Sequence, residues 1–255
     1  MDFELTRDEK LFVEAVKEFA ERHVSPVWEE IDEKKEIPLD LIKKMGEQGL
    51  FSIPVDEKYG GQGGTYFMTT LAVEEIAYAD PAVAIAVYML LNNGWPYALE
   101  LFGKEEAKEE ILPKVSKGDA FFGIATTEPQ GGSDIAGVKT SAERKDGKWV
   151  LNGEKVYISG VGEVQRLPWG GGWFLVARTG PEEQGHRALT AFAFLARKGG
   201  DLVRGFEPTL FEEIGRGGLT TGGFALKDVE IDDMYVIGDV NKGFYHVMEG
   251  FNLAR

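Results

Sequence analysis

The stretch GDAFFGIATTEPQGGSD, residues 118–134, divides the chain into two parts with different patterns. Before it, apolar residues recur three and four positions apart, which is the spacing of one face of an α-helix. After it, apolar runs are short, rich in β-branched and aromatic residues, and separated by Gly, Pro or Asp, as is typical of strands joined by turns. Helices followed by strands predict an α+β fold and disfavour the alternation of a Rossmann fold.

Residues 1–118 are predicted to form an all-α domain. Thr6, with Glu9 three residues later, gives the capping-box signature of a helix start. A further helix is expected over 65–79. The dipeptide Asp80-Pro81 predicts an N-cap and a first helical position, and the nearly all-apolar sequence after it predicts a helix that is buried almost all round.

Residues 119–238 are predicted to form an antiparallel β-barrel or sandwich, because short strand-like segments alternate with turn residues. A helical pattern resumes in residues 239–255 and runs to the last residue. We therefore expect a helical domain, a β domain and the start of a C-terminal helical domain, as in a truncated protein.

Charge and residue counts exclude several classes of function. The 43 acidic residues against 28 basic ones give a net charge of −15, which disfavours nucleic acids and anionic membranes as partners. The absence of cysteine excludes disulfides and Cys-ligated metals, and three widely spaced histidines argue against a metal site. The start MDFELTRDEK lacks the apolar core of a signal peptide, and the longest apolar run, 82–91, is too short to span a bilayer. We therefore expect a cytoplasmic protein with no membrane insertion.

The most informative motif is TTEPQGGSD, residues 126–134. It follows an apolar strand and offers two hydroxyls, then glycines that allow a ligand to approach the backbone closely. Its backbone N–H groups and Ser133 could hold a pyrophosphate without a cation. The same residues could form a β-turn with an Asx-type hydrogen bond from Asp134, and composition alone favours that reading.

Two further motifs are weaker. Tyr157-Ile158-Ser159 ends a strand, and its ring and hydroxyl, on one face by the period of two, could flank a planar ring, although such aromatic residues usually belong to the core. The Gly-rich loop 59–65 precedes a helix but lacks the strand and the Lys of phosphate-binding loops, so we interpret it as a structural turn.

Together, in this order, the motifs resemble those of the acyl-CoA dehydrogenase superfamily over essentially the whole chain. The motifs that carry the resemblance are Tyr59-Gly60-Gly61-x-Gly63, Thr127-Glu128-Pro129, Gly132-Ser133-Asp134, Leu151-Asn152-Gly153-x-Lys155 and Gly243-Phe244. The resemblance implies FAD and acyl-CoA as ligands. It also implies a helical domain, a middle β domain and a C-terminal four-helix domain, with the full-length parent a homo-oligomer.

The resemblance also assigns ligand contacts. The implied cofactor contacts are Ile124, Thr126, Thr127, Gly132, Ser133, Tyr157, Ile158 and Ser159. The implied substrate contacts are Ser133, Phe251, Asn252 and Arg255. This chain has Tyr-x-Ser where the family commonly has Trp-x-Thr, and Asn252 where the family often has Asp.

The implied reaction is FAD-dependent α,β-dehydrogenation of an acyl-CoA thioester, with electron-transferring flavoprotein as a possible acceptor. A base must take the α-proton while the β-hydride goes to the flavin. In most branches the base lies beyond residue 255, and in the isovaleryl and long-chain branches it stands where this chain has Ala254. We therefore expect no catalytic base in this chain and no activity from the chain alone.

Two departures leave alternatives open. The variant at residues 130–134 also resembles the alkylation-response branch, so a flavin-binding module without turnover is the second hypothesis. The connection over residues 160–172 is longer than usual in the family, and we expect it to be an exposed surface loop.

Overall fold

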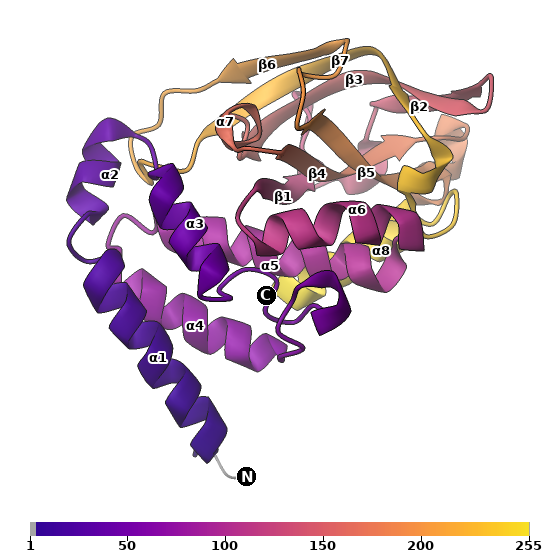
Figure 1. The fold of residues 1–255 in the computed structure, drawn as a ribbon. Coiled ribbons are helices and arrows are strands. Elements are labelled where there is room, and N and C mark those ends of the chain that lie inside the picture. The colour runs from indigo at the N-terminus through magenta and orange to yellow at the C-terminus, as the bar shows by residue number, and fades with distance from the viewer. Residues whose placement is uncertain (1–3, 255) are drawn as a thin grey trace.

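The computed structural model describes residues 4–254, and it places helices on one side of a curved sheet (Figure 1). The helices before the sheet are α1 (Arg7–His23), α2 (Trp28–Lys34), α3 (Leu39–Glu47), the 3-10 turn η1 (Glu57–Tyr59), α4 (Tyr66–Ala79), α5 (Ala84–Phe102) and α6 (Glu105–Ser116). Helix α8 (Gly243–Ala254) follows the sheet and lies beside α5 under the strands (Figure 1). The predicted α+β class is confirmed. Within the described residues, no helix has the length and apolar character needed to cross a membrane.

The capping signals mark two helix starts correctly. At the start of α1, the Glu9 amide donates to the Thr6 hydroxyl at 3.2 Å, and the Thr6 amide donates to the Glu9 carboxylate at 2.7 Å. Thr65 accepts a hydrogen bond from the Met68 amide at 3.2 Å in front of α4. Each side chain therefore satisfies amides that have no partner inside the helix.

The expected start at Asp80-Pro81 is wrong, because Asp80 ends α4 and α5 begins only at Ala84. Val83 stands at the N-cap with a left-handed φ of 54°, which delays the helix. The Asp80 carboxylate still reaches past this turn and accepts the Ile85 amide at 2.7 Å. The Asp80 side chain thus caps α5 as predicted, but Asp80 lies three residues before the N-cap residue, Val83, and does not occupy the N-cap position itself.

Within residues 4–254, eight strands form one mixed sheet. They are β1 (Ala120–Ala125), β2 (Ser141–Lys145), β3 (Lys148–Ser159), β4 (Gly170–Arg178), β5 (Leu189–Lys198), β6 (Phe206–Leu210), β7 (Thr221–Ile231) and β8 (Val236–Ile237). Their order is β6-β7-β3-β2-β4-β5-β8, and β1 pairs with β4. Most neighbours are antiparallel, but β1 and β2 each run parallel to β4, with Ile124 opposite Phe174 and Ser141 opposite Arg178. A wholly antiparallel sheet was therefore the wrong expectation at β4, because the segments between β4 and these two strands are long enough to let the chain return in the same direction.

Residues 160–172 do not form the exposed loop that was expected. They contain the short helix α7 (Glu163–Arg166) and the first residues of β4, and most of their side chains are buried. A Cβ on Gly171 would lie 2.0 Å from the Phe121 carbonyl oxygen, and one on Gly172 would lie 1.8 Å from the Phe194 carbonyl oxygen. These glycines therefore allow β4 to approach its neighbours closely, instead of forming a turn.

Helix α5 is buried almost all round, as its composition predicts, because it packs against α4, α6, α8 and β1. Two buried asparagines on this helix fix its neighbours. The side-chain oxygen of Asn92 accepts the Phe122 amide at 3.0 Å, and that of Asn93 accepts the Ile53 amide at 2.6 Å. The helix thereby holds the start of β1 in place.

Candidate functional site

The segment that follows β1 carries most of the predicted cofactor contacts. Ile124 is half-buried at the end of the strand, Thr126 is buried and Thr127 is half-buried. Within the part of the chain that the structure describes, neither threonine hydroxyl makes a hydrogen bond. These two hydroxyls are free to bind a ligand.

A tight turn presents Gly132 and Ser133. Glu128 and Gly131 exchange backbone hydrogen bonds of 3.2 and 3.0 Å, which forms a β-turn. The Asx-type hydrogen bond expected with this turn is not found among the described residues, since the Asp134 side chain caps no amide. Ser133 is exposed, and the amides of Gly132 and Ser133 donate to no backbone acceptor among the described residues. The turn and the anion-binding interpretation are compatible, because the turn leaves these two amides available.

The second predicted segment ends β3 with a bulge. The pairing with β7 shifts between Val156 and Ile158, so that Tyr157 is the extra residue, and its φ is 57°. The Tyr157 side chain is 73% exposed and contacts the ring of Phe211 edge-on at 5.8 Å. Ile158 is buried and Ser159 is half-buried. An exposed aromatic ring held at a bulge is unlike the core aromatic that is usual in strands and that we expected to be the commoner case.

The two segments lie side by side. The Val156 amide donates to the Thr127 carbonyl oxygen at 3.0 Å, directly before Tyr157. The structure thus brings together the two motifs that the sequence leaves thirty residues apart.

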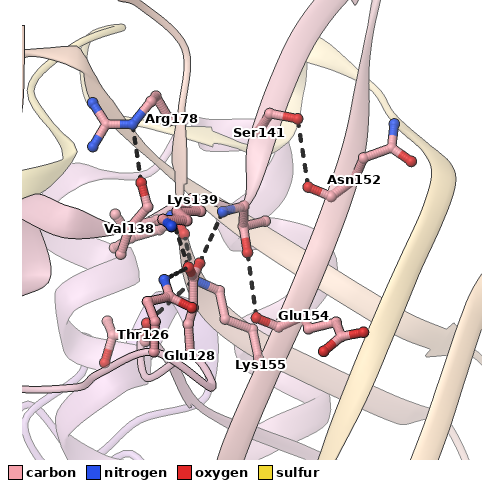
Figure 2. Close-up of polar contacts among 12 residues, drawn as sticks. Thr126, Glu128, Val138, Lys139, Ser141, Asn152, Glu154, Lys155 and Arg178 are labelled. Carbon is pink, nitrogen blue, oxygen red and sulfur yellow. Dashed lines mark hydrogen bonds and ion pairs between the residues drawn. The ribbon is translucent and has the colours of Figure 1, made fainter. Parts of the chain in front are cut away.

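A buried ion pair lies behind this junction (Figure 2). The Lys155 ammonium is 2.7 Å from the Glu128 carboxylate, and both side chains are almost completely buried. Burial by itself would raise the pKa of Glu128, but Lys155 and several hydrogen bonds outweigh it and hold that pKa at about 2. Burial lowers the pKa of Lys155 to about 8 against the attraction of Glu128. Both groups are therefore charged near neutral pH.

Helix α8 carries the predicted substrate contacts. Phe251 is half-buried and packs edge-on against Trp95 of α5 at 5.5 Å, and Trp95 packs against Phe174 at 5.3 Å. Because Phe174 pairs with Ile124, a continuous apolar path joins α8 to the cofactor segment. Asn252 is exposed and makes no hydrogen bond with Ser133. Arg255 lies outside the described residues.

Comparison with protein families decides the classification. The acyl-CoA dehydrogenase N-terminal domain matches residues 6–119, and the acyl-CoA dehydrogenase middle domain matches residues 123–229. The chain belongs to the acyl-CoA dehydrogenase family. The resemblance inferred from the motifs is confirmed.

Individual proteins are similar to this member of the acyl-CoA dehydrogenase family along nearly its whole length. The probable acyl-CoA dehydrogenase YngJ of Bacillus subtilis is 32% identical over 96% of this chain and 61% of its own length. The acryloyl-CoA reductase (NADH) of Anaerotignum propionicum is 33% identical over 100% of this chain and 62% of its own length. The solved butyryl-CoA dehydrogenase of Megasphaera elsdenii superposes with a TM-score of 0.88 at 27% identity, over 100% of this chain and 64% of that chain. The chain thus spans a little over 60% of the length of these family members.

For this acyl-CoA dehydrogenase family member, sequence reasoning missed the roles of Glu128 and Lys155, although both stand in the quoted motifs. The available signal was the period of two, which places Lys155 on the same face as the apolar Trp149 and Leu151, where a charge is rare unless it is paired. The sequence also missed the buried Glu163 of α7, which accepts a hydrogen bond from Thr220 and lies 3.3 Å from Arg166. Burial raises the pKa of Glu163, against the hydrogen bond from Thr220 and the charge of Arg166. Among the described residues, no group of His, Asp and Glu could hold a metal ion.

Proposed function

We propose that residues 124–133 and 157–159 bind FAD, and that the chain is the flavin-binding part of an enzyme that dehydrogenates acyl-CoA thioesters. One observation carries this proposal. The Val156–Thr127 backbone hydrogen bond joins the segment that carries the unpartnered hydroxyls of Thr126 and Thr127 to the segment that carries the exposed ring of Tyr157. Adjacent segments that offer hydroxyls and an exposed aromatic ring suit a flat heteroaromatic ligand with polar edges.

The donor set of the chain fits FAD. The free amides of Gly132 and Ser133 suit a pyrophosphate, since such amides bind anions without a cation. A Cβ on Gly131 would have no atom within 4 Å, so the turn is open on that side. Because the chain has a net charge of −15, a pyrophosphate site built from neutral donors suits it better than a site built from cationic side chains.

In the proposed reaction, the residues of the chain bind and orient the cofactor and the substrate. Thr126, Thr127 and Ser159 hold the polar edge of the flavin, and Tyr157 lies against its ring. Ser133 and Phe251, with Asn252 and Arg255, contact the acyl-CoA. When bound, FAD supplies the acceptor for the β-hydride of the thioester, and we propose electron-transferring flavoprotein as the onward acceptor.

The α-proton needs a base, and Ala254 has no carboxylate to supply one. We therefore propose that these 255 residues bind FAD but do not dehydrogenate acyl-CoA by themselves, and that the full-length parent is a homo-oligomer. The second candidate function, a flavin-binding module without turnover, shares this expectation for the unchanged chain.

The variant Ala254→Glu separates the two functions, with Ala254→Gln as a control of the same size and no charge. The chain is reconstituted with FAD, mixed with butyryl-CoA without oxygen, and followed by the visible flavin absorption. A dehydrogenase scaffold predicts that the flavin band bleaches faster in Ala254→Glu than in Ala254→Gln. Equal rates in the two variants would favour the module without turnover, and a chain that retains no FAD would refute both functions.

A further inference from the structure

The ion pair between Glu128 and Lys155 lies where the two proposed flavin segments meet. Lys155 is part of β3, two residues before Tyr157, while Glu128 lies in the turn that leads to Ser133. Neither side chain reaches the surface, so neither can contact a ligand directly. Any effect on a ligand must act through the residues that the pair holds.

Lys155 uses all three protons of its ammonium group on fixed acceptors. These are the Glu128 carboxylate at 2.7 Å, the Val176 carbonyl at 2.9 Å and the Thr126 carbonyl at 3.2 Å (Figure 2). One side chain therefore ties β3 to β4 and to the segment that follows β1.

The bond to the Thr126 carbonyl also fixes the next amide. In a trans peptide, the carbonyl oxygen and the following N–H point to opposite sides of the chain. Because Lys155 holds the Thr126 oxygen from inside, the Thr127 N–H is directed away from the buried ammonium. Among the described residues this N–H donates to no backbone acceptor, so it is presented as a ligand donor.

Glu128 orders the other end of the turn. Its carboxylate accepts the Lys139 amide at 2.7 Å, the Thr140 amide at 3.0 Å and the Gln130 side-chain amide at 2.5 Å. These bonds join the start of the 128–140 loop to its end, as Figure 2 shows, and the loop carries Gly132 and Ser133 between them. The whole loop is thereby closed on one carboxylate.

Stability alone does not account for this arrangement, since two apolar side chains of similar volume often stabilise a core as well as a buried ion pair does. We propose that the Glu128–Lys155 pair is a positioning device, which fixes residues 126–133 against residues 157–159 and so sets the affinity of the chain for FAD. This inference rests on the proposed function. Neither residue is catalytic, because both act through the segments that they hold.

The test compares the double variant Glu128→Gln/Lys155→Met with the unchanged chain. The double variant removes both charges and leaves no unpaired buried ion. The control is Glu207→Gln/Lys227→Met, which removes an exposed pair of the same length, 2.7 Å, from the same sheet. FAD affinity is measured by fluorescence titration, and folding by thermal unfolding and by amide hydrogen exchange without FAD.

A positioning role predicts that the double variant unfolds close to the temperature of the unchanged chain but binds FAD roughly tenfold more weakly or worse, because the segments must then be ordered on binding. Amide exchange should become faster at residues 126–140 and stay unchanged in α5, while the control matches the unchanged chain in every measurement. A double variant with unchanged FAD affinity would overturn the positioning role, and so would unchanged exchange at residues 126–140. Failure of the unchanged chain to bind FAD would instead refute the proposed function on which this inference rests.

Discussion

The stability of the chain should depend on pH through Glu128 in a way that can be isolated. The carboxylate is 3% exposed, and its pKa is about 2 in the folded chain against an ordinary value of 4.5. A difference of this size corresponds to a stabilisation on the order of 3 kcal/mol. Because the unfolded chain takes up this proton first as the pH falls, the stabilisation is complete above pH 4.5 and is lost progressively towards pH 2.

The variant Glu128→Gln removes this titration and leaves Lys155 buried without its counter-ion. At pH 7 the variant should be less stable by about 3 to 5 kcal/mol, which is the usual cost of breaking a buried pair. As the pH falls towards 2, the wild type should lose roughly 3 kcal/mol relative to the double variant Glu128→Gln/Lys155→Met, which has neither titrating group. The double variant with Lys155→Met should recover much of the loss at pH 7, so that the two residues are coupled by about 2 kcal/mol or more.

Guanidinium unfolding followed by the fluorescence of the five tryptophans, at several pH values, measures these differences. Glu207→Gln is the control, since Glu207 also pairs with a lysine at 2.7 Å but is 56% exposed, and it should change stability by less than about 1 kcal/mol at every pH. The reasoning is refuted if the double variant and the wild type differ by the same free energy at pH 7 and at pH 3. It is also refuted if the double variant is no more stable than Glu128→Gln at pH 7.

Two further predictions concern the helices around the site. Trp95→Ala should lower the free energy of unfolding by about 3 to 5 kcal/mol, because the Trp95 ring is 3% exposed and lies between Phe174 and Phe251. Leu101→Ala, on the exposed side of α5, is the control. A loss for Trp95→Ala as small as that of the control would contradict this packing. Glu163→Gln should be less destabilising at pH 7 than at pH 4, because the raised pKa of Glu163 stabilises the fold of the wild type at low pH and that contribution is lost as the pH rises. Denaturant unfolding of both proteins at the two pH values measures the loss of stability. A larger loss at pH 7 than at pH 4 would contradict the prediction.

The elements with local signals could be predicted from the sequence. The capping box at Thr6, the cap at Thr65 and the change of pattern at residue 118 each depend on residues that are neighbours along the chain. The segments proposed to bind the cofactor were indicated by their resemblance to family motifs, because the composition of residues 126–134 alone favours an ordinary turn. The helix start at Asp80 was misplaced by only a few residues, since the capping chemistry was correct and only the intervening turn was missed.

The features that the sequence could not show depend on contacts between distant residues. Every residue of β4 from Gly170 to Ala177 is buried, so no alternation of polar and apolar residues marks its direction or its partner. A run of three glycines at residues 170–172 looks like a loop in the sequence. Only the structure shows that these glycines serve packing, because a Cβ on Gly171 would lie 2.0 Å from the Phe121 carbonyl oxygen. The sequence around Lys155 does not reveal its partner either, because Glu128 lies 27 residues earlier, in the connection between β1 and β2.

The backbone of Tyr157 gives an independent reason to place the site at this junction. A left-handed φ is common for Asp and Asn, as at Asp146, Asp228 and Asn241 of this chain, because their side chains bond locally to the backbone. Tyr157 has no such compensation, and a residue held in this region costs about 1 to 3 kcal/mol. The strain does not bury the ring, which is 73% exposed, and so it is not repaid by packing in the core. A bulge that holds Tyr157 in this conformation and leaves its ring exposed supports the proposal of a ligand-binding edge at this end of the sheet.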